Sequence, residues 1–209
     1  MDVENSLGDA NFDSLRIGSV PSTLSFVRRM GLLALTNLLV TGNAGLASSE
    51  LSTEYKVKAA FLYNFTKFID WSKASSGTER KSIHLCIHGD NPFGSMLAAS
   101  VKGRTVRGKT IQVREVDVDD LSSCDLLFIS SSEKQHVEVL LADLPAKGIL
   151  TVADHSGFLS AGGGIELVID RGKVRFRINL AMVNRAELSV DSRLLALATE
   201  VLKGGGAAR

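Results

Sequence analysis

The sequence predicts an α/β fold: a single Rossmann-like domain with a mostly parallel sheet, an antiparallel C-terminal hairpin and helices on both faces. Short apolar runs that follow loops have the composition of strands buried on both faces. They lie at residues 83–87, 125–130 and 149–153. Capped helical segments separate them, which favours right-handed crossovers between parallel strands. Two later runs, 165–169 and 173–180, flank Asp170–Arg171–Gly172, a sequence typical of a hairpin turn.

The N-terminal region has the features of a removable export signal. Arg28 and Arg29 precede an apolar run from Met30 to Val40, which is shorter than the roughly 20 residues of a membrane-spanning helix. Small residues at Gly45 and Ala47 match a signal peptidase site. We therefore expect a periplasmic protein that is cleaved near Ala47.

The 27 residues ahead of Arg28 are longer than an ordinary n-region and carry four acidic side chains. They are interpreted as an extension or as the result of a start codon placed too far upstream, and the alternative is an uncleaved anchor. The expected division is 1–47, N-terminal extension plus signal peptide, and 48–209, an α/β domain. The domain carries 21 Lys+Arg and 19 Asp+Glu, and this near balance predicts no strong attraction to nucleic acid.

The first element of the domain is predicted as a helix from Glu50 to Trp71, because apolar residues recur at helical spacing. Ser52 and Thr53 are candidate N-caps. One helix face cannot hold all of its aromatic residues, so some of them are expected near the surface. The aromatic residues are Phe61, Tyr63, Phe65, Phe68 and Trp71.

Caps and breakers define the elements that follow. Asp90 or Asn91 can cap a helix with Pro92 in its first turn, and Ser131 or Ser132 can cap another. The remaining expected elements are a helix at 90–100, a strand at 111–116, an acidic connection at 117–123, a helix at 131–143 and a closing helix at 188–202.

The motifs of nucleotide and acyl chemistry are incomplete. The loop Gly89–Gly94 has two of the three glycines of a dinucleotide fingerprint, and Gly162–Gly164 is not followed by the Lys of a P-loop. Ser130–Ser132 follows a strand but lacks the Gly-x-Ser-x-Gly elbow, so helix capping is the favoured interpretation. Without an identifiable nucleophile, base and oxyanion donor, the sequence favours a binding protein over an enzyme, with no cofactor.

Cys86 and Cys124 are the only cysteines. In an exported protein such a pair predicts a disulfide, whereas in the cytosol it would predict two buried thiols. His84 and His88 flank Cys86 at even spacing on one strand, which allows a soft-metal site. A disulfide at Cys86 removes most of the basis for that alternative, and no metal is expected.

An ordered series of motifs resembles the YfiR family across residues 50–203. The likeness begins with the helical run at 55–68 and Trp71, and continues through 87–94 and 127–130. It extends over 149–152 and ends at 174–180.

The resemblance implies a non-catalytic periplasmic protein that binds and restrains a membrane-bound diguanylate cyclase, and so controls cyclic di-GMP and biofilm. It also implies release by an outer-membrane lipoprotein, a capacity to form homodimers, and a disulfide at Cys86 and Cys124. A second cysteine pair of the family's namesake is missing here. Relatives beside sensor kinases and TonB-dependent receptors leave open a second interpretation, a sensor subunit that binds a small ligand.

The first helix and the hairpin supply the candidate binding residues. They are Phe61, Asn64, Lys67, Trp71 and Asn179. Asn64, Lys67 and Asn179 are expected to line a small pocket, and the competing interpretation is local capping and contact with solvent.

Overall fold

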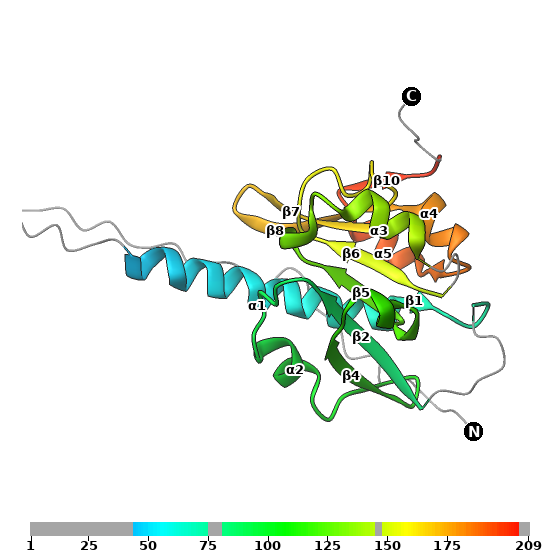
Figure 1. The fold of residues 1–209 in the computed structure, drawn as a ribbon, viewed down its shortest axis with the longest axis horizontal. Coiled ribbons are helices and arrows are strands. Elements are labelled where there is room, and N and C mark those ends of the chain that lie inside the picture. Colours follow the sequence, from blue (N-terminus) through cyan, green and yellow to red (C-terminus); the bar gives the residue numbers. More distant parts are fainter. Residues whose placement is uncertain (1–43, 75–80, 145–147, 205–209) are drawn as a thin grey trace, which may run out of the picture. The chain divides into compact units, whose positions relative to one another are not determined.

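The computed structural model describes residues 44–74, 81–144 and 148–204. Its centre is an eight-stranded sheet with the order β10-β8-β7-β6-β5-β2-β4-β3 (Figure 1). The strands are β2 (Ser82–His88), β3 (Thr105–Val106), β4 (Lys109–Glu115), β5 (Leu126–Ile129), β6 (Leu150–Ala153), β7 (Ile165–Asp170), β8 (Lys173–Asn179) and β10 (Glu200–Leu202). A separate antiparallel pair joins β1 (Ile69–Asp70) to β9 (Ser189–Val190).

The pairing of the strands confirms the mostly parallel, Rossmann-like sheet. Strand β2 pairs in parallel with β4 and β5, and parallel pairing continues from β5 to β6 and β7. The predicted hairpin is the antiparallel β7–β8 pair, in which Asp170 lies opposite Lys173. It does not form the edge of the sheet, because β10 adds outside β8 in parallel.

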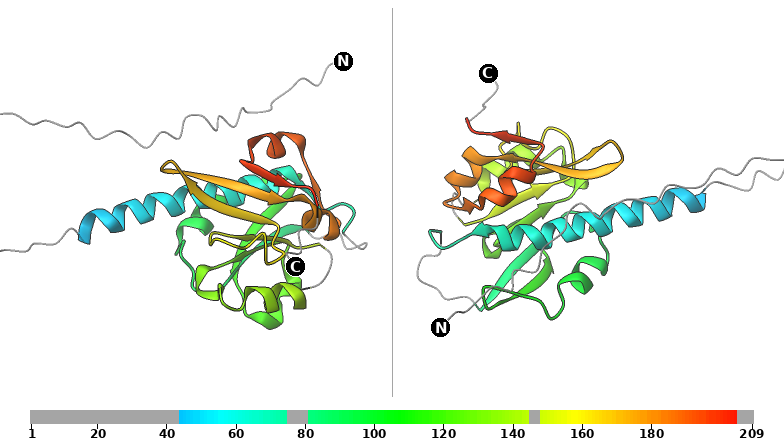
Figure 2. Two further views of the ribbon diagram at one scale, coloured as in Figure 1. Left: turned by 90° about the horizontal axis from the view of Figure 1, so that it is seen from above. Right: turned by 180° about the vertical axis from the view of Figure 1, so that it is seen from behind.

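Helices cover both faces of the sheet. The helices and 3-10 turns are α1 (Ala44–Phe68), α2 (Met96–Val101), η2 (Val118–Ser123), η3 (Ser131–Glu133), α3 (Val137–Asp143), α4 (Leu180–Arg185) and α5 (Ser192–Leu197). Helix α3 lies in front of the sheet in Figure 1, and α1 lies in front in the opposite view of Figure 2. None of the helices in the described ranges is long and apolar enough to span a bilayer.

The α1 face of the sheet is held by aromatic packing. Phe61 and Phe65 of α1 lie with their ring centroids 5.5 and 5.3 Å from that of Phe176 on β8. Phe65 and Phe176 are almost completely buried. Burying aromatic side chains of this size supplies a large part of a core's stability, and edge-to-face geometry adds to it.

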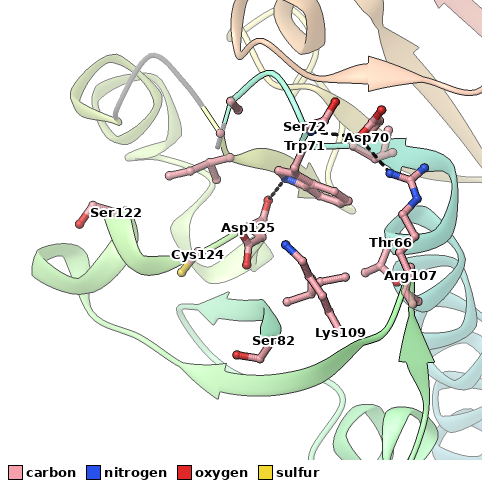
Figure 3. A pocket seen from close by; sticks show the side chains of 16 residues that line it. Thr66, Asp70, Trp71, Ser72, Ser82, Arg107, Lys109, Ser122, Cys124 and Asp125 are labelled. Atoms are coloured by element: carbon pink, nitrogen blue, oxygen red, sulfur yellow. Dashed lines mark hydrogen bonds and ion pairs between the residues drawn. The ribbon is translucent and has the colours of Figure 1, made fainter. Parts of the chain in front are cut away.

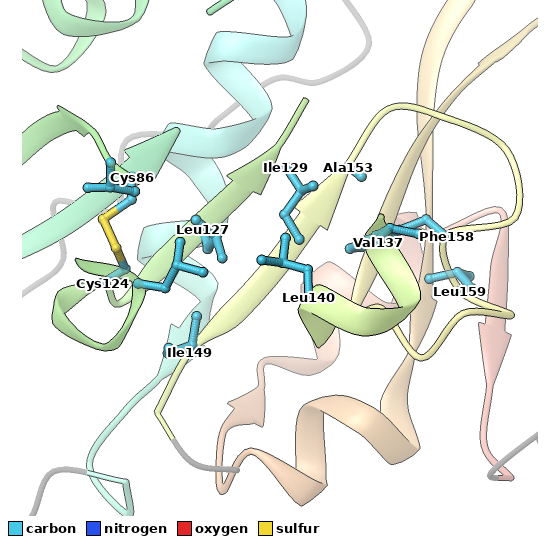
Figure 4. Packing of buried hydrophobic residues seen from close by; sticks show 12 residues of the cluster. Cys86, Cys124, Leu127, Ile129, Val137, Leu140, Ile149, Ala153, Phe158 and Leu159 are labelled. Carbon is cyan, nitrogen blue, oxygen red and sulfur yellow. A yellow bond between two sulfur atoms is a disulfide. The ribbon is translucent and has the colours of Figure 1, made fainter. Parts of the chain in front are cut away.

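The opposite face contains the disulfide, which joins Cys86 on β2 to Cys124 at the end of η2, with Cα atoms 5.8 Å apart. Leu127 and Ile129 of β5 point to this face and pack with Val137 of α3 (Figure 4). The disulfide expected for an exported chain is therefore present within the buried cluster.

Two predicted helices are wrong in extent. The first ends at Phe68 rather than Trp71, because Ile69 and Asp70 leave the helix to pair with β9. The closing helix expected at 188–202 is three elements: β9, the short helix α5 and strand β10. Asp191 caps α5 by accepting from the backbone N–H of Arg193, and Thr199 then donates its N–H to Phe176 O, which starts β10 along β8.

Two further helices differ from the prediction because non-α turns take the place of their expected first turns. The helix expected at 90–100 begins only at Met96, and the helix expected at 131–143 is divided into η3 and α3. The acidic connection at 117–123 contains η2. Residues 1–43, which include most of the predicted signal peptide, lie outside the described residues, and Ala47 lies in the first turn of α1.

Candidate functional site

A pocket of ≈ 380 Å³ opens at the edge of the sheet where the parallel strands begin (Figure 3). Ser82 starts β2, Lys109 starts β4 and Asp125 precedes β5, and all three line the pocket. The end of α1 and β1 supply the opposite wall, including Trp71. The volume lies within the range of small-molecule sites, roughly 300–1,000 Å³.

Trp71 is fixed in this wall by a hydrogen bond from its indole Nε1 to the backbone oxygen of Asp125, 3.1 Å long. The Asp125 carboxylate in turn accepts the backbone N–H of His84 at 2.8 Å. These bonds connect the segment after α1 to the starts of two strands, so the indole is held in position at the pocket.

A turn on the β3–β4 hairpin brings a cation to the pocket rim. Arg107 has a positive φ of 51°, which is uncommon for a residue with a side chain, and its Nη1 lies 2.9 Å from Oδ1 of Asp70. The backbone N–H of Ser72 also donates to this oxygen. That hydrogen bond, with the nearby guanidinium, lowers the pKa of Asp70, so Asp70 is ionised at neutral pH.

The carboxyl edge of the sheet, where Rossmann-like folds usually bind ligands, is filled by side chains. Phe93 is buried, and its ring lies edge-on to Phe128 and Tyr55 at centroid distances of 4.9 and 5.4 Å. Gly89 leaves β2 with a φ of 85°, and a Cβ at this position would lie 2.4 Å from Oγ of Ser132. The loop that resembles a dinucleotide fingerprint is therefore a packed turn.

A buried ionic group lies beside this packed turn. Asp154, directly after β6, accepts a hydrogen bond from the Tyr55 hydroxyl at 2.9 Å and pairs with Lys58 Nζ at 2.7 Å. Lys58 also pairs with Glu54, one helical turn earlier. Burial, followed by the Asp154 carboxylate, raises the pKa of Tyr55. This group fixes α1 to the end of β6.

The histidine and cysteine pattern on β2 does not form a metal centre. Cys86 is in the disulfide, while Nδ1 of His84 contacts Ser123 O and Nδ1 of His88 contacts Val116 O. Among residues 44–74, 81–144 and 148–204, no three His, Cys, Asp or Glu side chains are grouped to hold a metal.

The residues predicted for binding are not brought together. Trp71 lines the pocket described above, whereas Asn179 lines a different cavity near α3 and α4. Asn179 is buried, caps α4 by accepting from Met182 N–H, and donates to Leu159 O. Phe61 belongs to the aromatic core. Asn64 and Lys67 do not line the cavity that Asn179 lines, and the shared pocket expected for the three residues stays a prediction.

Lys67 belongs instead to a surface that we call the cation–π surface, made of Tyr63, Lys67, Phe68, Arg104 and Arg193. Lys67 Nζ and Arg104 Cζ lie 5.0 and 4.7 Å from the Tyr63 ring centroid. Arg193 covers the Phe68 ring at 5.3 Å. The expectation that some aromatics of the first helix lie near the surface is met by Tyr63 and Phe68, which are only partly buried.

Sequence reasoning missed Lys109, Arg107 and Arg104. All three come from the basic segment after α2, between the expected helix at 90–100 and the expected strand at 111–116. Its repeated Arg and Lys residues were the available signal. The residues that Arg104 and Arg107 contact, Tyr63 and Asp70, are about 40 residues away in sequence, so these contacts become visible only in the fold.

The fold and the site define an α/β domain with a small-molecule-sized pocket and an exposed cationic surface. A family model described as YfiR/HmsC-like matches residues 55–199. The chain belongs to this family.

Among solved structures, similarity is distant. The ABC domain in complex with L-Trp from Streptococcus pneumonia has 10% identity and a TM-score of 0.45, and the match covers 71% of this chain. A conserved domain protein from Vibrio cholerae O1 biovar El Tor str. N16961 has 12% identity and a TM-score of 0.44 over 70% of this chain. The match covers 60% of each of those chains. No curated protein matches the chain.

Proposed function

We propose that this protein is a periplasmic, non-catalytic regulator that binds and restrains a membrane-bound diguanylate cyclase, and thereby controls cyclic di-GMP and biofilm formation. The observation that carries the proposal is the YfiR/HmsC-like family match, which spans residues 55–199 and so nearly the whole described domain. The disulfide and the signal-like N-terminal region support an oxidising compartment. An outer-membrane lipoprotein that relieves the restraint and a homodimeric state belong to the same proposal.

The cation–π surface is the proposed contact with the cyclase. Lys67 and Arg104 are exposed, and neither has an ion-pair partner among the described residues. Stacking on Tyr63 restricts both side chains, so less conformational entropy is lost when they meet a carboxylate. Asn64 lies one turn before Phe68 on the same helix and is proposed as a neighbouring polar contact.

Gene deletion tests the regulatory proposal. Loss of a restraining protein is expected to raise cyclic di-GMP and surface attachment, and the wild-type gene is expected to restore both. Unchanged cyclic di-GMP and attachment in the deletion strain would refute restraint of a cyclase. Fractionation with N-terminal sequencing tests the location, with a mature chain starting near Ser48 as the expected result.

Charge reversal tests the surface. Lys67→Glu with Arg104→Glu is expected to behave like the deletion while the purified protein keeps its melting temperature. The matched control is Lys173→Glu with Arg175→Glu, which makes the same charge change at exposed positions of β8. If the Lys67→Glu, Arg104→Glu variant complements the deletion fully, the cation–π surface is not the contact with the cyclase.

A second function, a sensor subunit that binds a small ligand for a kinase or TonB-dependent receptor, is favoured by the ≈ 380 Å³ pocket beside Trp71. Thermal-shift screening with amino acids and nucleotides tests it, and a uniformly flat response would count against it.

A further inference from the structure

The pocket at the start of the parallel strands has an apolar wall on which a planar group can lie. Ile69, Ile83 and Ile149 line it and are nearly or fully buried, so their contribution is a fixed aliphatic surface. The indole of Trp71 also lines the pocket and is held in place by its bond to the Asp125 oxygen. An aromatic ring placed on an indole gains roughly 0.5–1.5 kcal/mol beyond the area it buries.

Two of the acidic side chains of the pocket have polar partners among the described residues, one an arginine and the other a backbone N–H. Arg107 is paired with Asp70 at 2.9 Å, and the Asp125 carboxylate accepts the His84 backbone N–H at 2.8 Å. The Lys109 ammonium has neither an ion pair nor a hydrogen bond within the described parts of the chain. In Figure 3 it points into the cavity, toward the side where Trp71 and Asp125 lie.

An ammonium in a concave, partly apolar site selects for negative charge, because a ligand carboxylate replaces water there with a charge-assisted hydrogen bond. We propose that this pocket binds a small planar organic acid, with its carboxylate on Lys109 and its ring against Trp71. The inference rests on the second proposed function, a sensor subunit that binds a small ligand, and it specifies the chemical class of that ligand.

The position of Trp71 makes the test direct, because it is the only tryptophan of the chain. The intrinsic tryptophan fluorescence of the protein therefore reports the occupancy of this pocket alone. The full-length mature protein is titrated with benzoate, nicotinate and cinnamate, and in parallel with benzamide, nicotinamide and cinnamamide. Each amide has nearly the shape of its acid but carries no charge.

The expected result is a saturable change in Trp71 emission with at least one acid, and binding at least tenfold weaker for its amide. Lys109→Met is expected to weaken acid binding at least tenfold, while Lys109→Arg retains most of it. Lys102→Met is the matched control, since Lys102 is an exposed lysine that does not line the pocket, and it should bind like the wild type.

Three results would overturn the inference: flat emission with all six compounds to millimolar concentration, equal affinity for acids and amides, or equal effects of Lys109→Met and Lys102→Met. None of these results depends on the cyclase. The titration therefore tests the proposed ligand class independently of the deletion experiment. The purified protein could bind acids selectively while deletion of its gene leaves cyclic di-GMP unchanged. That combination would support the ligand class and refute the proposed restraint of a cyclase.

Discussion

Nζ of Lys58 lies 2.7 Å from Oδ2 of Asp154, and the two side chains are only 5% and 2% exposed. The pair joins the middle of α1 to the carboxyl end of β6. Oδ1 of Asp154 is buried without a hydrogen bond among the described residues, so the carboxylate depends on its contacts through Oδ2. A charge in this setting is tolerated only because it is paired.

Removing one partner of this pair is therefore expected to be costly. Lys58→Met should lower the free energy of unfolding by about 3–5 kcal/mol, because it leaves a buried carboxylate uncompensated. Adding Asp154→Leu should recover much of that loss. Urea unfolding measures both, with Lys56→Met at an exposed position of the same helix as control. A loss in Lys56→Met equal to that in Lys58→Met would contradict this account.

Reduction of the Cys86–Cys124 disulfide is expected to lower stability by about 4 kcal/mol, because the bond closes a loop of 38 residues in the unfolded chain. Guanidinium unfolding with and without a reductant measures the difference. The variant with both cysteines changed to Ala should show the same loss and no response to the reductant. Equal midpoints for the oxidised and reduced wild type would show that the bond adds nothing.

The β7–β8 turn offers a stabilising substitution. Arg171 has a φ of 49° and Gly172 a φ of 73°, which is the conformation of a two-residue turn that prefers Asn-Gly. Arg171→Asn is expected to raise the free energy of unfolding by about 0.5–1 kcal/mol, since Asn tolerates this region better than Arg. Thermal unfolding measures the change, and Arg175→Asn, on the neighbouring strand, should not produce it.

Asp191 makes one part of the stability dependent on pH. Hydrogen bonds from the Arg193 side chain, and then from its backbone N–H, lower the pKa of Asp191 to about 2. A carboxyl whose pKa is lower in the folded state stabilises the fold above its unfolded value, near 3.9. That stabilisation is lost as the pH falls from about 4 through about 2.

NMR titration of the carboxyl carbon measures this pKa. Arg193→Gln should move it back toward its ordinary value, because the main cause of the shift is removed. Arg185→Gln, at the end of α4, should leave it unchanged. A wild-type midpoint near 3.9 would contradict the hydrogen-bonded geometry.

The central parallel strands could be predicted because each is a continuous apolar run, and the hairpin because its turn residues are specific. Strand β10 could not, since Val201 and Leu202 also continue a helical apolar stripe. Only pairing with β8, which needs the folded sheet, decides between the two. Local periodicity is overridden by such tertiary contacts.

Of the residues that line the candidate pocket, only Trp71 was among the binding residues predicted from the sequence. Lys109 and Asp125 join it because the starts of parallel strands meet at one edge of a sheet, and their order in that sheet is not encoded locally. Phe61 and Asn179 were predicted as binding residues from their residue types. In the structure, Phe61 packs against Phe176, and Asn179 caps α4. Their part in binding stays a prediction.

The disulfide also determines how far the chain can be stretched. Pulled from its two ends, the oxidised protein cannot extend the segment between Cys86 and Cys124, which are 38 positions apart in the sequence. At about 3.4 Å per residue, roughly 130 Å of contour length stays hidden until the bond is reduced. The force–extension curve of a single molecule therefore records its redox state, and a population drawn from the cell would reveal which fraction had met an oxidising compartment.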